Sequence, residues 1–301
     1  MLRNANKVSS YWNATDQQDA LEFFDFLMDA SYCYDMLFTG KLERQYICTG
    51  CDSICRRQES YRNISVTCNA QVRSLKGALD NYQAPEYLTG DNLYDCDRCK
   101  IKTVGKCQTW IQKYPSVLTI SLIKYDVNRE SGCYGKVNNL IKIDLELPFE
   151  ARCGGQSNID VDEIEDGDKV NGGGKVNGGR ERSRDSGHNS RGFGTENEDR
   201  DLDLVSDAST TDTNQNSIIR YKLTSIILHI GASVASGHYV TVVRRQQEWF
   251  LVDDHKVSRL TSQELDRLLN NEEPTSTPPK TERDRIIDNR NTYLLFYTRT
   301  M

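Results

Sequence analysis

A histidine and a pair of acids lie one predicted hairpin apart near the end of the chain. His238 opens the alternating stretch HYVTVVRR, and Asp253 and Asp254 close the next one, EWFLVDD. Such alternation predicts strands, and antiparallel neighbours can bring the start of one strand beside the end of the next. An acid beside an imidazole can orient it, as in a nucleophile–histidine–acid triad. Gly237 has no Cβ, which would let a substrate backbone pass close to the imidazole.

Two C-x-x-C pairs are a second set of residues that could do chemistry. Cys48 and Cys51 form the first pair, and Cys96 and Cys99 form the second. Four thiolates suit tetrahedral zinc, so the spacing predicts one structural zinc ion, provided that tertiary structure brings the pairs together. The alternative is that the pairs are unrelated thiols. The other cysteines lack paired spacing and are predicted to be structural: Cys33, Cys55, Cys68, Cys107, Cys133 and Cys153.

The segment TDQQDALEFFDFLMDAS predicts a helix over residues 15–31. Thr15 can cap it, and Gln18 can reach back from the third position to complete a capping box. Asp19 would then lie in the first turn, where a carboxylate interacts favourably with the helix N-terminus. Apolar residues at helical spacing form one face of this helix: Ala20, Phe23, Phe24, Leu27 and Met28.

Further elements follow from the hydrophobic pattern and from turn residues. The pattern predicts a pair of strands within residues 104–126, around Tyr114-Pro115, and a strand over residues 140–149. TSQELDRLL predicts a capped helix over residues 261–269. The segment EEPTSTPPKTERDR that follows it is predicted to be a surface loop.

Several of these segments together resemble the ubiquitin-specific proteases, also called ubiquitin carboxyl-terminal hydrolases. GASVASGHYVTVVR followed by WFLVDD is similar to the histidine box of that family, with His229 and Gly231 in its first part. QQDALEF resembles the glutamine box, EYLTGDNLYDCDRC the second zinc-binding pair, and YLLFYTR the closing strand. The resemblance implies an α+β, papain-like cysteine protease fold with a palm and zinc fingers. It also implies thiol attack on the isopeptide bond after the C-terminal glycine of ubiquitin.

The resemblance implies a role for each matching residue. His238 would be the catalytic base, and Asp253, counted from the tryptophan of WFLVDD, would be the acid that orients it. Asp19 would face the arginine-bearing tail of ubiquitin. Further ubiquitin-binding positions would be Gln18, Gly237 and Tyr239. The four paired cysteines would hold the zinc of the fingers.

The family's cysteine box, G-x-T-C-[YF]-x-N-S, has no counterpart in this sequence, and only residues 1–14 precede the glutamine-box helix. That box supplies the nucleophile, so we expect the thumb to be largely missing and the sequence to be a fragment or truncated gene model of an active enzyme. Whether this chain is itself an enzyme is therefore open. One alternative is a catalytically inactive ubiquitin-binding pseudoprotease. Another is a zinc-stabilised interaction domain unrelated to ubiquitin.

The expected organisation is an N-terminal remnant at residues 1–14 and one protease domain at residues 15–299, with fingers at about 38–115. Residues 151–217 are rich in Gly, Asn, Asp, Arg and Ser and poor in large apolar side chains. Such a segment cannot bury enough surface to offset its ordering entropy, so this insertion is predicted to be disordered.

Composition and charge narrow the class of partner and the compartment. The net charge of −6 argues against nucleic acid and suits a partner with a basic surface, which the resemblance identifies as ubiquitin and ubiquitinated proteins. The polar start has no signal-peptide core, and no apolar run approaches the length of a membrane span. We therefore expect no membrane partner and an intracellular protein, in the cytoplasm or nucleus.

Overall fold

The computed structural model describes residues 17–69, 71–127, 134–137, 139–150, 218–233, 236–271 and 281–300, all within one compact unit of the chain. The predicted remnant at residues 1–14 and the predicted disordered insertion at 151–217 lie outside the described residues. Helices and strands are mixed along the chain, so the predicted α+β class is confirmed. Within these ranges, no helix combines the length and the apolar character that a membrane crossing requires.

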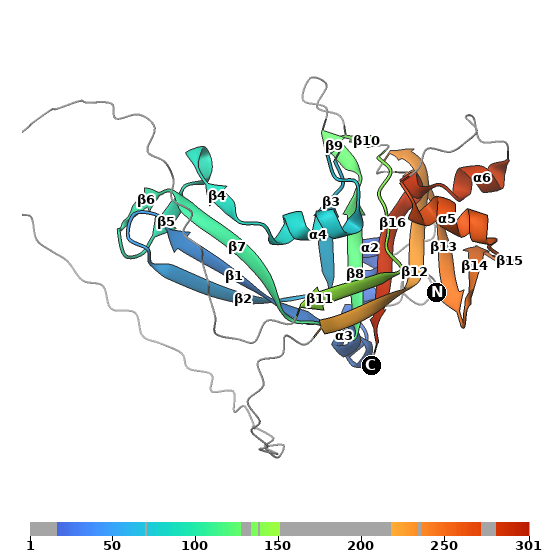
Figure 1. Ribbon diagram of the computed structural model, residues 1–301, viewed down its shortest axis with the longest axis horizontal. Helices are drawn as coiled ribbons and strands as arrows, with labels where there is room; N and C mark the ends of the chain where they lie inside the picture. Colours follow the sequence, from blue (N-terminus) through green and yellow to red (C-terminus); the bar gives the residue numbers. More distant parts are fainter. Residues whose placement is uncertain are drawn as a thin grey trace, which may run out of the picture. The chain divides into compact units, whose positions relative to one another are not determined.

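A large sheet holds half of the described strands (Figure 1). Its strands follow the order β15-β14-β13-β12-β16-β8-β3, and β11 pairs with β12 beside this path. All of these pairs are antiparallel except β3 with β8, which is parallel. The strands are β3 Asn63–Thr67, β8 Val117–Ile123, β11 Glu146–Glu150, β12 Ile218–Ser233, β13 Ser236–Arg245, β14 Glu248–Asp253, β15 Lys256–Arg259 and β16 Thr292–Arg299. The predicted closing strand is thus confirmed as β16, and it lies between β12 and β8.

A smaller sheet contains strands in the order β2-β1-β7-β4. They are β1 Gly40–Cys48, β2 Ile54–Tyr61, β4 Glu86–Leu88 and β7 Gly105–Lys113, and a hairpin of β5 Tyr94–Cys96 with β6 Ile101–Thr103 accompanies them. The two strands predicted around Tyr114-Pro115 are confirmed as β7 and β8, and they belong to different sheets: β7 to this sheet and β8 to the large one. Pro115 has no N–H for a ladder, and it marks the point where the chain passes between the sheets.

The helices are α2 Ala20–Asp29, α3 Tyr32–Phe38, α4 Leu75–Gln83, α5 Ser262–Leu269 and α6 Glu282–Ile286, with 3-10 turns η1 Gly90–Asn92 and η2 Asn289–Asn291. The first predicted helix starts later than expected. Asp19 is its N-cap, and Oδ1 of Asp19 accepts hydrogen bonds from the amides of Leu21 at 2.8 Å and Glu22 at 3.1 Å. Asp19 therefore precedes the first turn, and the predicted cap Thr15 lies outside the described residues.

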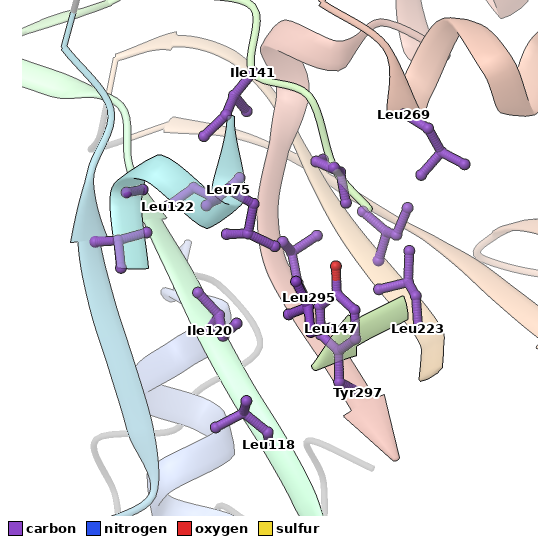
Figure 2. Close-up of a cluster of buried hydrophobic side chains, with 14 of the residues drawn as sticks. Leu75, Leu118, Ile120, Leu122, Ile141, Leu147, Leu223, Leu269, Leu295 and Tyr297 are labelled. Carbon is purple, nitrogen blue, oxygen red and sulfur yellow. The ribbon is translucent and has the colours of Figure 1, made fainter. Parts of the chain in front are cut away.

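The two faces of β8 and β16 differ in what covers them. Leu118, Ile120 and Leu122 of β8 are buried on the face that α4 covers through Leu75, as Figure 2 shows together with Leu295 and other core residues. Side chains alternate between faces along a strand, so Thr119 and Ser121 belong to the opposite face. There α2 packs, since the ring of Phe24 lies 5.8 Å from that of Phe296, the residue that pairs with Thr119. This second face of the sheet is the one that carries the start of α2.

Two predictions for the remaining segments need correction. The capped helix is confirmed as α5, with a capping box between Thr261 and Glu264. Part of the predicted surface loop after it forms α6, whose N-cap Thr281 and Asp284 make a second capping box. The strand predicted over residues 140–149 forms only from Glu146, because both backbone groups of Ile141 hydrogen-bond to the side chain of Asn289 instead of a neighbouring strand. A further pair, β9 Tyr125–Val127 with β10 Tyr134–Lys136, follows β8.

Candidate functional site

The structure brings His238 and Asp253 together from neighbouring strands. Nε2 of His238 lies 2.6 Å from Oδ1 of Asp253. The β13–β14 ladder begins with the pair Thr241 and Val252. His238 and Asp253 lie just beyond this pair and face each other diagonally across the two strands. A carboxylate only accepts hydrogen bonds, which makes Nε2 the protonated nitrogen and leaves Nδ1 as a proton acceptor. The His238 side chain is 47% exposed, so a thiol or a substrate can reach that nitrogen.

Asp254 lies at the turn that follows β14 and not within the strand. Its φ of 51° is in the left-handed region, which aspartate tolerates better than most residues. The turn brings a carboxylate oxygen of Asp254 into one group with Asp253 and the His238 ring, with their ligand atoms within 4.8 Å of one another. In a continuous strand, alternation would send Asp253 and Asp254 to opposite faces, but β14 ends at Asp253. The hydrogen bond to His238 nevertheless comes from Asp253.

Asp19 joins the start of α2 to β13 and β16. Besides capping α2, its Oδ2 accepts a hydrogen bond from the Tyr239 hydroxyl at 3.0 Å. The hydroxyl of Tyr293, at the start of β16, lies 3.0 Å from Oδ1 and 2.9 Å from Oδ2. The carboxylate is thus fixed by side chains from two strands of the sheet as well as by its own helix. Tyr239 was a predicted site residue, whereas Tyr293 was not singled out within the closing strand.

A second contact ties the glutamine-box segment to the histidine strand. The backbone N–H of Gly237 donates to Oε1 of Gln17 at 2.8 Å. Gln18, the predicted site residue, lies half-buried between Gln17 and Asp19, and its predicted role in ubiquitin binding stays a prediction. The sequence offered one signal for Gln17, which is that it also belongs to the QQDALEF motif. The start of α2 and the residue preceding His238 are therefore held together directly.

Gly237 is required for packing inside the protein. A Cβ built on Gly237 would lie 2.1 Å from Nε2 of His229. The sequence suggested that the missing Cβ leaves room for a substrate backbone, but the His229 ring occupies that space. This ring is only 5% exposed and lies 4.9 Å from the ring of Tyr239. Burial lowers the pKa of His229, and the positive charge of Lys136 lowers it further, while the negative charge of Asp19 opposes the shift.

Two lysines support the start of β16. Lys124 is 2% exposed, and its Nζ donates to the carbonyl oxygen of Asn289 at 2.7 Å and to Oγ1 of Thr292 at 2.6 Å. Lys136 Nζ donates to the carbonyl oxygen of His229 at 3.0 Å and also contacts η2. Burial lowers the pKa of Lys124 to about 7. These bonds fix the residues directly before Tyr293, which holds Asp19.

A cavity of about 190 Å³ adjoins this assembly. Its walls include the carboxylate of Asp19, both tyrosines and polar side chains of β3 and β8. The lining residues are Asp19, Leu21, Ser65, Ser121, Leu122, Ile123, His229, Tyr239 and Tyr293. The cavity therefore offers a fixed negative charge among apolar and hydroxyl groups, which suits a positively charged extended segment.

The four paired cysteines converge at the ends of β1 and β5. The sulfur atoms of Cys48 and Cys99 are 3.8 Å apart, and those of Cys51 and Cys96 are 3.6 Å apart. Zinc–sulfur bonds of about 2.3 Å in a tetrahedron place sulfur atoms about 3.8 Å apart. All four sulfur atoms lie within 4.8 Å of one another. The donor set and its spacing therefore fit one tetrahedral metal ion.

The two C-x-x-C segments adopt the same turn. Asp52 follows the first pair with φ of 53°, and Lys100 follows the second with φ of 58°. The Asp52 amide donates to the carbonyl oxygen of Cys48 at 2.9 Å, and the Lys100 amide donates to that of Cys96 at 2.7 Å. Each turn directs its two thiols to one side. The Ser53 hydroxyl and the amide of Cys99 lower the pKa of Cys96, which favours the thiolate that a metal requires.

The whole chain matches one protein family. A family model described as ubiquitin carboxyl-terminal hydrolase matches residues 1–297. A curated relative, the probable ubiquitin carboxyl-terminal hydrolase 9 of Schizosaccharomyces pombe, is 24% identical over 316 residues, which cover 99% of this chain and 41% of the relative. Human ubiquitin carboxyl-terminal hydrolase 24 is 32% identical over 160 residues, or 48% of this chain and 6% of that protein. The chain thus spans less than half the length of these relatives.

Solved structures support the same fold. The SAGA Ubp8/Sgf11/Sus1/Sgf73 DUB module bound to ubiquitin aldehyde contains a chain that matches all of this one, with a TM-score of 0.64 and 20% sequence identity. The match covers 53% of that chain. A second structure, of a mutant form of the same SAGA DUB module bound to monoubiquitin, matches with a TM-score of 0.63. At this identity the likeness concerns the fold.

Proposed function

Because the chain belongs to the ubiquitin carboxyl-terminal hydrolase family, we propose that it is a thiol-dependent deubiquitinase domain that binds ubiquitin and serves hydrolysis of the isopeptide bond after its C-terminal glycine. The observation that carries the proposal is the 2.6 Å contact between Nε2 of His238 and Oδ1 of Asp253. In this pair Asp253 orients the imidazole and stabilises its protonated form, and Nδ1 of His238 accepts the proton of a thiol.

The thiol has to lie at Nδ1 of His238. Among the described residues, the hydrogen-bonding partner of this imidazole is Asp253 and not a cysteine. A cysteine-box segment of the family, placed against this edge of β13, would complete a Cys–His–Asp site. We propose that such a segment acts with residues 15–299 as one protease domain, with fingers at about 38–115.

We assign ubiquitin binding to the cavity beside Asp19. The carboxylate is already oriented by Tyr239 and Tyr293, so an arginine of the ubiquitin tail meets a preorganised acceptor. The two structurally similar modules hold ubiquitin aldehyde and monoubiquitin, which supports this assignment. Gly237 and Gln18 flank the same edge, at the strand start and in the glutamine-box segment.

We propose that the cysteine cluster binds one structural zinc ion through Cys48, Cys51, Cys96 and Cys99. Bound zinc would lock the β1–β2 connection to the β5–β6 hairpin by four covalent ligands. This role concerns the small sheet alone, and the chemistry at His238 requires no metal in this proposal.

Titration of ubiquitin into the purified chain tests the binding half of the proposal. We expect saturable binding, which Asp19→Asn weakens because the amide presents an N–H where the tail requires an acceptor. Asp80→Asn, a matched change on the exposed side of α4, should bind like the wild type. Absence of binding at millimolar ubiquitin would contradict the proposal. Binding without hydrolysis, in a chain extended by a cysteine-box segment, would instead indicate a pseudoprotease.

A further inference from the structure

A buried ring lies against the residue that precedes His238. Gly237 comes directly before His238 in β13. The next residue, Tyr239, pairs with His229 of β12, and the His229 side chain is only 5% exposed. Because side chains alternate along a strand, the His238 imidazole and the His229 ring lie on opposite faces of the sheet. The His229 ring therefore supports, from the opposite face, the strand segment that presents the His238 imidazole.

Two glycines make room for the His229 ring. A Cβ built on Gly237 would lie 2.1 Å from Nε2 of His229, and one built on Gly231 would lie 3.2 Å from Cε1 of the same ring. The register of the β12–β13 ladder shifts between Ile230 and Ser233. Such a shift leaves a residue unpaired and interrupts the ladder. At Gly237 the contact with the ring therefore sets how closely the two strands approach each other.

The His229 ring is itself held in place from several directions. Nζ of Lys136 donates to the carbonyl oxygen of His229 at 3.0 Å. The ring of Tyr239 lies 4.9 Å from the His229 ring, and the ring of Tyr293 lies 6.4 Å from it. The hydroxyls of both tyrosines donate to the carboxylate of Asp19. The ring that supports Gly237 is thus part of the same rigid assembly as the acid of the neighbouring cavity.

We propose that His229 is a positioning residue, which fixes the His238 imidazole through the backbone of Gly237. A general base acts only within hydrogen-bond reach of the proton that it removes, and a misplacement of about 1 Å can cost roughly 10²-fold in rate. Gly237 meets the His229 ring at its Cα and Gln17 at its N–H, so the residue that follows it starts from a fixed point. The inference rests on the proposed function for the reaction that it serves, but the placement of the imidazole is measurable without that reaction.

Ring 15N resonances of the histidines, recorded on the zinc-loaded full chain, test this placement. In alkaline buffer they report which ring nitrogen carries the proton, and the bond to Asp253 selects Nε2 of His238 in the wild type. We expect His229→Ala to shift the His238 resonances toward a mixture of both tautomers, and His229→Leu, which refills most of the space, to shift them less. Leu223→Ala is the control, because it truncates a buried residue elsewhere in β12 and should lower the melting temperature without moving these resonances.

Unchanged His238 resonances in His229→Ala would overturn the proposal. If His229→Ala does not fold, the same criterion applies to His229→Leu, which keeps an apolar side chain in the space.

A double variant tests the contact itself, by the same resonances and by kcat/KM in the chain extended by a cysteine-box segment. Gly237→Ala should reduce kcat/KM by about 10²-fold, because the new Cβ meets the His229 ring. Adding His229→Ala removes that obstacle, so the double variant should be more active than Gly237→Ala alone. Gly231→Ala is the matched control. Its Cβ would lie 2.5 Å from the carbonyl oxygen of Ser236, so His229→Ala should not rescue it.

Losses that multiply in the double variant of His229 and Gly237 would overturn the proposal, whereas rescue confined to this pair supports it. If the extended wild-type chain does not hydrolyse ubiquitin conjugates, the proposed function fails. In that case the ring resonances of the same variants alone decide whether His229 positions the His238 imidazole.

Discussion

The cysteine cluster and the histidine site are built in opposite ways. Each half of the cysteine cluster is a short turn, and the two halves have the same backbone geometry at Asp52 and Lys100. The histidine site has no such local unit, since His238 is oriented by Asp253 from the next strand, and the preceding residue, Gly237, is held by Gln17 from the start of the described chain. The comparison teaches that spacing along the sequence specifies each half of the cysteine cluster, and tertiary packing only has to join the two halves, whereas tertiary packing assembles the histidine site residue by residue.

Removing the proposed zinc ion is the strongest way to disrupt the cysteine cluster. Metal binding at a structural site contributes about 10–16 kcal/mol in zinc-finger peptides, so chelation or Cys96→Ser should unfold the β5–β6 hairpin and its neighbours. Hydrogen exchange should show lost protection in the small sheet and little change in β13. The matched control is Cys107→Ser, a half-buried cysteine of β7 outside the cluster. Elemental analysis well below one zinc per folded wild-type chain would refute the assignment.

Replacing each acid near His238 sharpens the account of the second site. In a chain extended by a cysteine-box segment, Asp253→Ala should reduce kcat/KM by about 10³–10⁴, because the imidazole loses the group that fixes its tautomer. Asp254→Ala should cost far less, since Asp254 lies nearby but the hydrogen bond comes from Asp253. The two variants are controls for each other, and the reverse order of activities would mean that Asp254 is the orienting acid.

Lys124 tests how far the histidine site depends on buried support. Its folded-state pKa of about 7 is below the unfolded value of about 10.4, so between these pH values the unfolded chain binds one more proton than the folded chain. The free energy of unfolding should therefore rise with pH by roughly 5 kcal/mol through this group. Lys124→Met should flatten that rise in denaturant titrations from pH 7 to 10. Lys142→Met, at an exposed lysine, should retain it.

The smallest expected effect lies at the junction of α5 and α6. The hydrogen bond from Arg283 lowers the pKa of Glu264 to about 2, so its contribution is present above the unfolded pKa and is lost as pH falls toward 2. Glu264→Gln keeps a capping-box residue but should remove about 1–2 kcal/mol of this acid-dependent stability, after allowance for solvent screening. Glu248→Gln, at a more exposed ion pair, is the control. An acid-unfolding curve unchanged by Glu264→Gln would exclude this origin.

The contrast between locally specified turns and a site assembled by tertiary packing also explains which features the sequence could predict. Local signals were sufficient for α5, with its TSQE capping box, and for pairing the cysteines that form the cluster, while the family resemblance identified the closing strand β16. The start of α2 was placed too early because Asp19, and not Thr15, provides the cap. More than one residue of this segment has a side chain that can cap a helix. The tyrosine hydroxyls that fix Asp19 come from strands more than two hundred residues away in sequence, so the local sequence does not show which residue is the cap.

Burial of polar groups was the part that the sequence did not reveal. Lys124 lies in the segment predicted to form strands, and nothing in the pattern of that segment indicates that it is buried and hydrogen-bonded to the residues before Tyr293. Gly237 reads as an opening for substrate, but the ring of His229 fills that space. Both outcomes depend on which strand becomes a neighbour, and periodicity along a single strand carries no information about that choice.

The most direct test of the central claim measures the release of a fluorescent amine from the C-terminus of ubiquitin by the chain extended with a cysteine-box segment. Our account predicts release that requires the added cysteine and falls to background in His238→Ala, while ubiquitin binding by that variant stays close to wild type. Hydrolysis that persists in His238→Ala, or none at all in a folded, ubiquitin-binding wild-type chain, would contradict the assignment of His238 and Asp253 as the acid–base pair of a deubiquitinase.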